Sequence, residues 1–388
     1  MDFELTETQQ ATIEGIRPVA GQFTDEYWRE RDERGEFPWD FYNALAAGGW
    51  VGITIPEQYG GAGLGIGEAA VMLEEVAATG AGMNGASSLH LTVFGMNPVV
   101  KHGSEEMKQR YLPSVADGSL HVCFGVTEPD AGSDTTRITT RARRKGDRYV
   151  IDGRKVWTSK AADCSKVLVL ARTTPRDQCE KPTDGMTLLL ADLDPQHTEI
   201  RPIHKMGRNA VASNELFIDG LEVAVEDRVG EEGKGFSYLL DGLNPERILI
   251  AHEALGLGRV ALERAARYAR ERVVFDRPIG ANQGIAFPLA QAQMQLSAAG
   301  LMARQAAWLY DNGKPCGPEA SSAKYLCAEA AFFAADRAVQ THGGMGYAKE
   351  YDVERYFREA CLMRLAPISQ ELVMSYVARR VLGLPRSY

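Results

Sequence analysis

The sequence lacks the cysteine patterns that mark zinc sites and disulfide frameworks. Its cysteines include no C-x-x-C pair, and Cys123 with the nearby His121 has no second pair to complete a metal site. Scattered cysteines are typical of a reduced, cytosolic protein. We therefore expect free thiols and no bound metal; the six positions are Cys123, Cys164, Cys179, Cys316, Cys327 and Cys361.

Long apolar runs are also missing. The best candidates are short, such as 167–171, whereas a helix that crosses a bilayer needs about 20 apolar residues. The N-terminal segment carries acidic residues where a signal peptide needs basic ones, and it has no apolar core. These absences predict a soluble, cytoplasmic protein with no membrane span.

Basic residues are fewer than acidic ones. Lys and Arg total 43 against 52 Asp and Glu, a formal net charge of -9, and no block of like charges stands out. This balance argues against a general nucleic-acid binder. It leaves room for a small anionic ligand, because a few arginines and helix N-termini hold phosphates locally.

The period of the apolar residues changes twice and divides the chain into three parts. At roughly 150 residues per domain, 388 residues suggest two or three domains. Residues 1–120 have mainly the helical period, with Ser104 as an expected N-cap and Gly118 near a helix end. Residues 121–232 follow a two-residue period, and residues 233–388 return to the helical one.

These periods predict a small antiparallel β domain between two helical domains. Asp-Gly and Gly-Asp pairs recur in the middle part, where we expect turns between strands at 148–157, 166–174, 186–194 and 215–224. Four long helices with short connections suit a four-helix bundle in the last part. Its last helical stretch is expected to run from Asp352 to Leu382.

Two segments of the middle part have residues suited to an aromatic cofactor. Cys123-FGVTEPDAGSD holds the hydroxyls of Thr127 and Ser133 among turn formers, whose backbone N–H groups suit a polar ring or a phosphate. Trp157 and Ser159, two apart on an expected strand, point to the same side and suit the face and edge of a ring. An ordinary turn and a core tryptophan are the alternatives.

Three further segments lie in the last part. Asn244-Pro245-Glu246-Arg247 opens an apolar helix, with Asn244 as a candidate cap, and an acid stabilised by the helix dipole is the ordinary interpretation. Arg272-VVFDRPIGANQGIAF and the glycine-rich Gln340-THGGMGY each suit a dinucleotide contact or a plain turn between helices.

In this order and spacing, the five segments resemble the acyl-CoA dehydrogenase family, flavoenzymes that introduce a trans double bond between Cα and Cβ of acyl-CoA thioesters. The motifs that carry the resemblance are Thr127-EPDAGSD, Trp157-TS, Arg272-VVF and Gln340-THGGMGY. The resemblance covers essentially the whole chain. It implies a mainly α fold with an N-terminal helical domain, a central barrel-like antiparallel β domain and a C-terminal four-helix bundle.

The resemblance implies FAD as the cofactor and assigns its contacts position by position. The flavin would be lined or flanked by Phe124, Val126, Thr127, Ser133, Trp157 and Ser159, and Ser133 would also touch the acyl-CoA. The ADP half of an FAD in a neighbouring subunit would be held by Arg272, Phe275, Gln283, Gln340, Gly343 and Gly344. This sharing of FAD between subunits implies a homotetramer, a dimer of dimers.

The catalytic glutamate departs from the commoner pattern of the family. Many members place it in a Y-E-G-T-S-E segment near the C-terminus, but here that stretch reads Ala366-PISQE, with Pro367 in its place. A minority, similar to the isovaleryl- and long-chain-type dehydrogenases, supplies the base from the first bundle helix, directly before an arginine. Glu246 matches that position, while Glu371 is a fallback that we expect to face away.

The resemblance implies that Glu246 removes the α-proton while a hydride passes from Cβ to flavin N5, and that an electron-transfer flavoprotein takes the electrons. Asn244 and Arg247 are expected to bind substrate, and Ser369 to keep a hydroxyl contact to FAD. Pro367 has no N–H for the thioester carbonyl, so Ala366 or Ile368 must supply one. Burial should raise the pKa of Glu246 against the effect of the helix N-terminus.

Several alternatives share every residue named so far. They are an acyl-CoA oxidase, an enoyl-CoA reductase and an enzyme acting on an acyl carrier protein. The non-enzyme alternative is a non-catalytic subunit of a heteromeric dehydrogenase, and the joint presence of Glu246, Arg247, Thr127, Trp157 and Ser159 weighs against it. A base on the bundle helix goes, in the family, with branched or long acyl chains, which suggests fatty or branched acyl metabolism. Short, alicyclic and aromatic acyl groups stay open.

Overall fold

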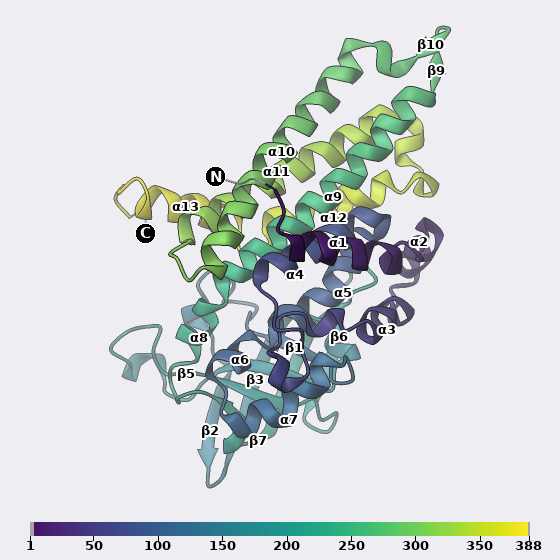
Figure 1. Cartoon of the computed structure of the whole chain (residues 1–388). Helices are drawn as coiled ribbons and strands as arrows, with labels where there is room; N and C mark the ends of the chain where they lie inside the picture. The colour runs from purple at the N-terminus through teal and green to yellow at the C-terminus, as the bar shows by residue number, and fades with distance from the viewer. Residues whose placement is uncertain (1–3, 387–388) are drawn as a thin grey trace.

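The computed structural model describes residues 4–386 and contains helical, sheet and helical parts in the expected order. A long helical bundle rises from the sheet, and the N-terminal helices lie against the half of the bundle nearer to it (Figure 1). No helix within residues 4–386 is long and apolar enough to cross a membrane. All six cysteines are free thiols, as expected.

The N-terminal helices begin at side-chain caps in several places. Hydroxyls of Thr6, Thr24 and Ser104 accept backbone N–H groups of the first turn that have no partner inside the helix. The expected cap at Ser104 is therefore confirmed. The helices are α1 (Glu7–Ala20), α2 (Asp25–Arg34), α3 (Trp39–Ala47), α4 (Ile66–Val76), α5 (Gly82–Gly95), α6 (Asn97–His102) and α7 (Glu105–Ala116).

The strands of the middle part form one sheet in the order β6-β7-β3-β2-β4-β5-β8, with β1 paired to β4. Most pairs are antiparallel, as expected, but β1 and β2 each run parallel to β4. The strands are β1 (Val122–Gly125), β2 (Arg141–Lys145), β3 (Arg148–Ser159), β4 (Lys166–Arg172), β5 (Met186–Asp192), β6 (Thr198–Pro202), β7 (Ser213–Ala224) and β8 (Arg228–Val229).

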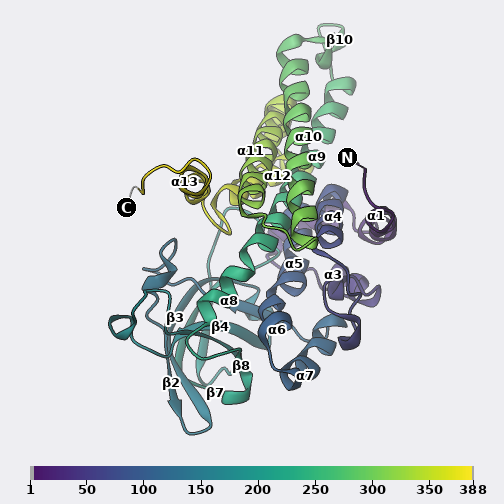
Figure 2. The same cartoon turned by 60° about the vertical axis from the view of Figure 1, so that its left-hand side comes forward.

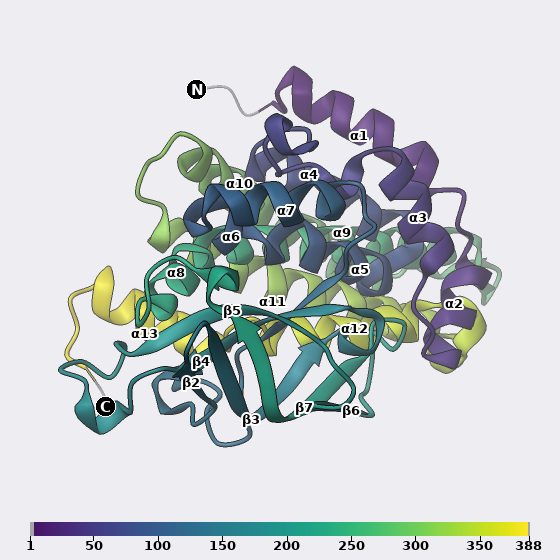
Figure 3. The ribbon, with the colours of Figure 1, turned by 90° about the horizontal axis from the view of Figure 1, so that it is seen from below.

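The apolar run of β4 is explained by burial on both faces. Leu168 and Leu170 join a cluster with side chains of α6 and α7, while Val167 and Val169 face a second cluster inside the sheet domain. A strand buried on both sides shows no polar alternation. Seen from below, the helices cover the sheet as a separate layer (Figure 3).

Two Asp-Gly pairs lie inside strands, within the expected strand ranges 148–157 and 215–224. Asp152-Gly153 and Asp219-Gly220 lie inside the long strands β3 and β7, where the pairing register shifts between Ile151 and Gly153. Such a shift is a β-bulge, an irregularity that glycine also favours because it lacks a Cβ. The Gly146-Asp147 pair does form a turn, between β2 and β3.

The bundle is built around one central helix, and its last predicted helix is in fact two. The chain breaks at 366–369, because Pro367 cannot donate the N–H that a helix needs, and α13 lies beside the bundle (Figure 2). The elements are α8 (Gly235–Asp241), α9 (Leu243–Glu271), β9 (Val273–Val274), β10 (Arg277–Pro278), α10 (Gln283–Asp311), α11 (Gly317–His342), α12 (Val353–Leu365) and α13 (Gln370–Arg380).

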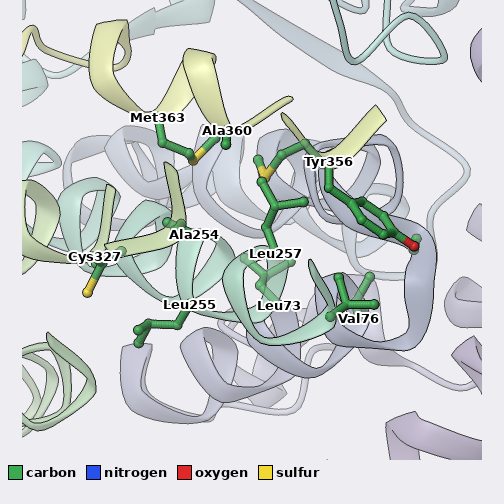
Figure 4. Packing of buried hydrophobic residues seen from close by; sticks show 14 of the residues in the cluster. Leu73, Val76, Ala254, Leu255, Leu257, Cys327, Tyr356, Ala360 and Met363 are labelled. Atoms are coloured by element: carbon green, nitrogen blue, oxygen red, sulfur yellow. The ribbon is translucent and has the colours of Figure 1, made fainter. Parts of the chain in front are cut away.

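The central helix α9 is packed on several sides at once. Leu257 lies in one buried cluster with Leu73 of α4 and with Tyr356 and Met363 of α12 (Figure 4). The backbone of α4 approaches so closely that a Cβ at Gly256 would collide with the Glu74 carbonyl oxygen. Close approach on several sides holds the ends of α9 in place relative to the sheet.

Candidate functional site

The residues expected beside a flavin gather where β1 runs into a loop next to β3. Phe124 lies on β1, and Val126 and Thr127 follow it. The N–H of Val156 donates to the Thr127 carbonyl at 2.9 Å, which holds the loop against the strand that carries Trp157. Ser133 lies exposed further along the same loop. The structure therefore brings the first two predicted segments together.

A buried ion pair that the sequence analysis missed holds this loop. Lys155 Nζ donates to Glu128 Oε1 at 2.9 Å and to the Val126 carbonyl at 3.1 Å. The Glu128 carboxylate also accepts the N–H groups of Thr139 and Thr140 at 2.6 and 2.9 Å. Burial opposes ionisation, but Lys155 and these donors outweigh it and lower the pKa of Glu128 to about 2.

Trp157 is not a core tryptophan. Its side chain is 56% exposed, although the strand around it is largely buried, and it has a positive φ of 61°. The register between β3 and β7 shifts between Lys155 and Thr158, so the indole belongs to a bulge that turns it out of the core. Such strained bulges occur at functional sites. This one presents an aromatic face beside the Thr127 loop.

The segment that carries Glu246 differs from the sequence prediction in its cap. Helix α9 begins at Leu243, directly after Gly242 ends α8, so Asn244 lies within the first turn. The expected Asn244 cap is wrong: its Oδ1 accepts a hydrogen bond from Arg247 Nη1 at 3.1 Å. Pro245 is tolerated there because first-turn N–H groups have no partner in the helix.

Glu246 is half-buried in a polar cluster at the junction of the three parts. Burial raises the pKa of its carboxyl group, which confirms the predicted direction, while the charges of His90 and Arg247 oppose the rise and that of Glu253 adds to it. His90 Nδ1 lies 2.6 Å from Glu253 Oε1. The sequence analysis missed both, although the adjacent polar residues His252 and Glu253 interrupt the apolar stretch 248–258, which is an unusual signal.

Ser159 is linked to this cluster through Arg208, another residue that the sequence analysis missed. Arg208 Nη2 donates to the hydroxyls of Ser159 and Ser213 at 3.1 and 3.2 Å. Burial lowers the pKa of Arg208, and the charge of Glu253 opposes that fall. The residue predicted at the flavin edge is thus joined to charges near Glu246.

A groove with a volume of about 460 Å³ opens beside the start of α9. Its walls come from α8, α9 and α13, and they include the predicted substrate residues Asn244 and Arg247. Arg379 and Arg380 add positive charge, and Tyr376 adds an aromatic ring. A groove of this composition suits a long ligand with phosphate groups.

Several polar groups of the segment 366–369 already have hydrogen-bond partners. The Ala366 N–H donates to the Leu362 carbonyl at 3.0 Å, so of the two candidate donors for a thioester carbonyl, Ile368 is favoured. Lys324 Nζ donates to the Ile368 carbonyl at 2.7 Å. The Ser369 hydroxyl caps α13 by accepting the Leu372 N–H at 3.3 Å.

The residues expected at an ADP moiety lie at the opposite end of the bundle. At 1.5 Å per residue, the helix from Glu246 to Arg272 spans about 40 Å. Phe275 is 94% exposed in the two-residue turn between β9 and β10 (Figure 1). Gln283, Gln340, Gly343 and Gly344 are also exposed. These residues and Glu246 cannot touch one FAD within a single chain.

Comparison with known proteins identifies the family. Models of the acyl-CoA dehydrogenase N-terminal, middle and C-terminal domains match residues 6–119, 123–221 and 233–382. Acyl-CoA dehydrogenase FadE12 of Mycobacterium tuberculosis is 38% identical over 389 residues, which cover 99% of this chain and 98% of that one. The chain belongs to the acyl-CoA dehydrogenase family.

Two further members show the range of the family. The caffeyl-CoA reductase-Etf complex subunit CarC of Acetobacterium woodii is 35% identical over 353 residues, covering 89% of this chain and 91% of that one. The structure of butyryl-CoA dehydrogenase from Megasphaera elsdenii superposes with a TM-score of 0.93 at 30% identity, covering 98% and 100% of the two chains. Membership of this family makes the chain an FAD-dependent oxidoreductase.

The residues at the junction fit a flavin. The exposed indole of Trp157 offers a flat apolar face, and the exposed Ser133 hydroxyl lies on the loop packed beside it. Within the described residues, Nε of Arg208 is buried and donates to no acceptor. An aromatic face with unused polar groups near it suits a planar, polar ring system.

We expect the buried Glu128–Lys155 pair to control stability and its pH dependence. Glu128→Gln should lower the free energy of unfolding by about 3 kcal/mol at pH 7, because it leaves Lys155 buried without an anion. The ordinary pKa of Glu128 is 4.5 and its folded value is about 2, so its contribution is complete above pH 4.5 and is lost as the pH falls towards 2. Urea unfolding followed by circular dichroism between pH 3 and 7 measures this.

Glu222→Gln is the matched control, because Glu222 pairs with Arg148 across 3.7 Å on the exposed surface of the same domain. It should change stability by less than about 0.5 kcal/mol. Equal effects of the two substitutions would contradict the role given to the buried pair.

Proposed function

We propose that the chain oxidises an acyl-CoA thioester to the trans-2-enoyl-CoA, with Glu246 as the base and an electron-transfer flavoprotein as electron acceptor. The observation that carries the proposal is the position of Glu246, half-buried at the start of α9 beside the groove that includes Arg247. The alternative base, Glu371, is exposed, and hydrogen bonds from its own N–H and from Ser369 lower its pKa.

The raised pKa of Glu246 suits removal of a weakly acidic proton. A base is most effective when its pKa lies near the working pH, because it is then both ionised and strong enough to take the proton. Burial moves the pKa of Glu246 in that direction. The bound FAD supplies the acceptor for the hydride that leaves Cβ.

The same pocket must stabilise the negative charge that develops on the thioester oxygen. The segment after α12 contributes the Ile368 N–H, because the Ala366 N–H is already bonded and Pro367 has none. Lys324 holds the Ile368 carbonyl at 2.7 Å and so restrains this peptide. The arginines of the groove suit the phosphates of CoA.

A second function, reduction of an enoyl-CoA, is favoured by the likeness to the caffeyl-CoA reductase subunit. The two reactions are the reverse of each other and use the same groups, since Glu246 would then return a proton to Cα. That relative's name also includes an Etf complex, which supports an electron-transfer flavoprotein as the partner in either direction.

The purified protein should be yellow, and its flavin absorbance should bleach under anaerobic conditions when the right acyl-CoA is added. The expected result is loss of the visible flavin bands with one class of thioester, because hydride transfer reduces the flavin. A panel of short, branched, long, alicyclic and aromatic acyl-CoAs defines the class. A flavin that is reoxidised by an enoyl-CoA but not bleached by any acyl-CoA supports the reductase instead, and a chain without flavin contradicts both.

Glu246→Gln should abolish bleaching while leaving the fold and the FAD content unchanged. The amide has nearly the same shape as the carboxyl but cannot accept the α-proton, so we expect the rate to fall by at least about three orders of magnitude. Stopped-flow absorbance at the flavin band measures the rate, and the absorbance ratio of flavin to protein measures the content.

Glu371→Gln serves as the control for a carboxylate in the segment where many relatives carry the base. Because Glu371 is exposed on α13, this variant should bleach at a rate close to that of the parent protein. Near-normal bleaching by Glu246→Gln would overturn the assignment of the base.

We further propose that the chain forms a homotetramer in which one subunit completes the FAD site of another. Helix α10 presents an exposed apolar stripe of Phe287, Met294, Leu301 and Trp308, each seven residues after the last. A stripe of this spacing is typical of a helix packed against a partner. The exposed Phe275, in the turn between β9 and β10, lies at the end of the bundle where α10 begins (Figure 1).

Met294→Glu combined with Leu301→Glu should break the assembly and release FAD together. Two charges in the middle of the stripe would be buried without partners on association. Light scattering after gel filtration should show a smaller species, and most of the flavin should be lost. Met206→Glu, at an equally exposed methionine outside the stripe, should change neither. A smaller species that keeps its flavin would contradict the shared site.

A further inference from the structure

A buried histidine–glutamate pair lies close to Glu246, and the proposed reaction does not use it. His90 on α5 is 8% exposed and Glu253 on α9 is completely buried. Their Nδ1 and Oε1 atoms are 2.6 Å apart, a short distance that is typical of a hydrogen bond between charged groups. Burying a charged pair is costly, so the presence of Glu253 in the otherwise largely apolar stretch 248–258 of α9 needs a reason.

Glu246 and Glu253 lie on the same face of α9. They are seven residues apart, which is almost two helical turns and about 10 Å along the axis. Helix α5 packs against α9 and brings His90 to this face. The charges of His90 and Glu253 both act on Glu246, in opposite directions, and His90 has the larger effect.

Arg208 approaches Glu253 from the sheet domain. Its guanidinium is held by the hydroxyls of Ser159 and Ser213, and the charges of Arg208 and Glu253 act on each other. Within residues 4–386, Oε2 of Glu253 and Nε of Arg208 are buried and have no hydrogen-bond partner. The charge of Glu253 therefore acts on both Glu246 and Arg208, and Arg208 is hydrogen-bonded to Ser159.

We infer that His90 and Glu253 are positioning residues: a buried, hydrogen-bonded pair on the face of α9 that carries Glu246, in which His90 favours the ionised form of the Glu246 carboxylate. This inference rests on the proposed function of Glu246. The imidazole of the pair matters because burial favours the protonated form of Glu246, and a protonated carboxyl group cannot take the α-proton.

Glu253 in turn favours the charged form of His90. Burial opposes the imidazolium form, but the charge and hydrogen bond of Glu253 outweigh it, so the pKa of His90 lies above its ordinary 6.5. Glu246 acts in the same direction on His90, and Arg208 acts against it. Glu246 itself is influenced by His90 from α5 and by Arg247 and Glu253 from its own helix. The charges of His90 and Glu246 therefore favour each other.

A purely structural role is the alternative, because the pair also ties α5 to α9. The chain offers a matched comparison on the same helix. His252 is 1% exposed, and its Nδ1 lies 2.7 Å from Glu74 Oε2, but neither residue is among the charges that act on Glu246. Each pair joins a histidine to a glutamate across two helices. Glu74 is less buried than Glu253 and also accepts a hydrogen bond from Arg259 Nη1 at 2.8 Å, and only the His90–Glu253 pair acts on the charge of Glu246.

The test is the pH dependence of the single-turnover bleaching rate in the FAD-loaded protein with its acyl-CoA. The rate should fall on the acid side as Glu246 becomes protonated. His90→Gln should move this acid limb to higher pH by about one unit, because a nearby positive charge is lost. His90→Gln with Glu253→Gln, which replaces the charged pair by two amides, should move the limb in the same direction by less. His252→Gln should leave it in place.

An acid limb that stays in place in both His90 variants would overturn the inference, even if they are less stable. A limb that moves equally in His252→Gln would overturn it as well, since the effect would then follow general loosening of α9.

A second readout is independent of turnover. The infrared carboxyl band that Glu246→Gln removes reports the protonation of Glu246 in the protein without substrate. Its midpoint should be higher in His90→Gln than in the parent protein. If Glu246→Gln keeps normal bleaching while the midpoint of the carboxyl band still moves in His90→Gln, the proposed function fails and the coupling between His90 and Glu246 stands. If Glu246→Gln is inactive and the midpoint does not move, the proposed function stands and the coupling fails.

Discussion

The structure depends on the packing of α9 against helices from both ends of the chain. Its N-terminal end carries Glu246 and Arg247 to the junction with the sheet, and its other end holds the turn around Phe275 at the tip of the bundle. Close approach of α4 at Gly256 leaves no space for a Cβ, so α9 cannot slide or turn without losing core contacts. The groups at both ends are therefore held at a constant separation.

Burial of charge is the main feature of the junction. Glu246, Glu253, His90 and Arg208 come from two helices and a loop, and each has its pKa or its hydrogen bonding altered by the others. In a medium of low dielectric constant, such charges interact more strongly than they would in water. A cluster that is costly to stability in this way is typical of a site selected for chemistry.

The proposed position of the base accords with the residues that follow α12. There the chain has Pro367 instead of a glutamate, and the segment is held by the Lys324 bond to the Ile368 carbonyl and by the Ser369 cap. The cofactor and the thioester determine where the α-proton lies, but they do not determine which element supplies the base. A carboxylate on α9 can therefore take the place of one that follows α12. Helix α9 and helix α13, which begins directly after this segment, border the same groove.

The sequence alone determined the order of the three parts, the strands and the long helices, because the apolar period reflects which face of each element is buried. It also determined Trp157, Thr127 and Glu246 as candidates, since each lies in a local motif. It could not determine the bulges at Gly153 and Trp157, the break at Pro367 within a helical pattern, or the side chain bonded to Asn244. Those depend on which partner strand or helix lies alongside.

Only the tertiary structure decided the pairs Glu128–Lys155 and His90–Glu253. Their members are 27 and 163 residues apart in the sequence, and each residue taken singly is an ordinary charged or polar side chain on a strand, loop or helix. The physical reason is that the energy of a buried charge depends on what surrounds it in space, and the neighbours along the chain do not specify those surroundings.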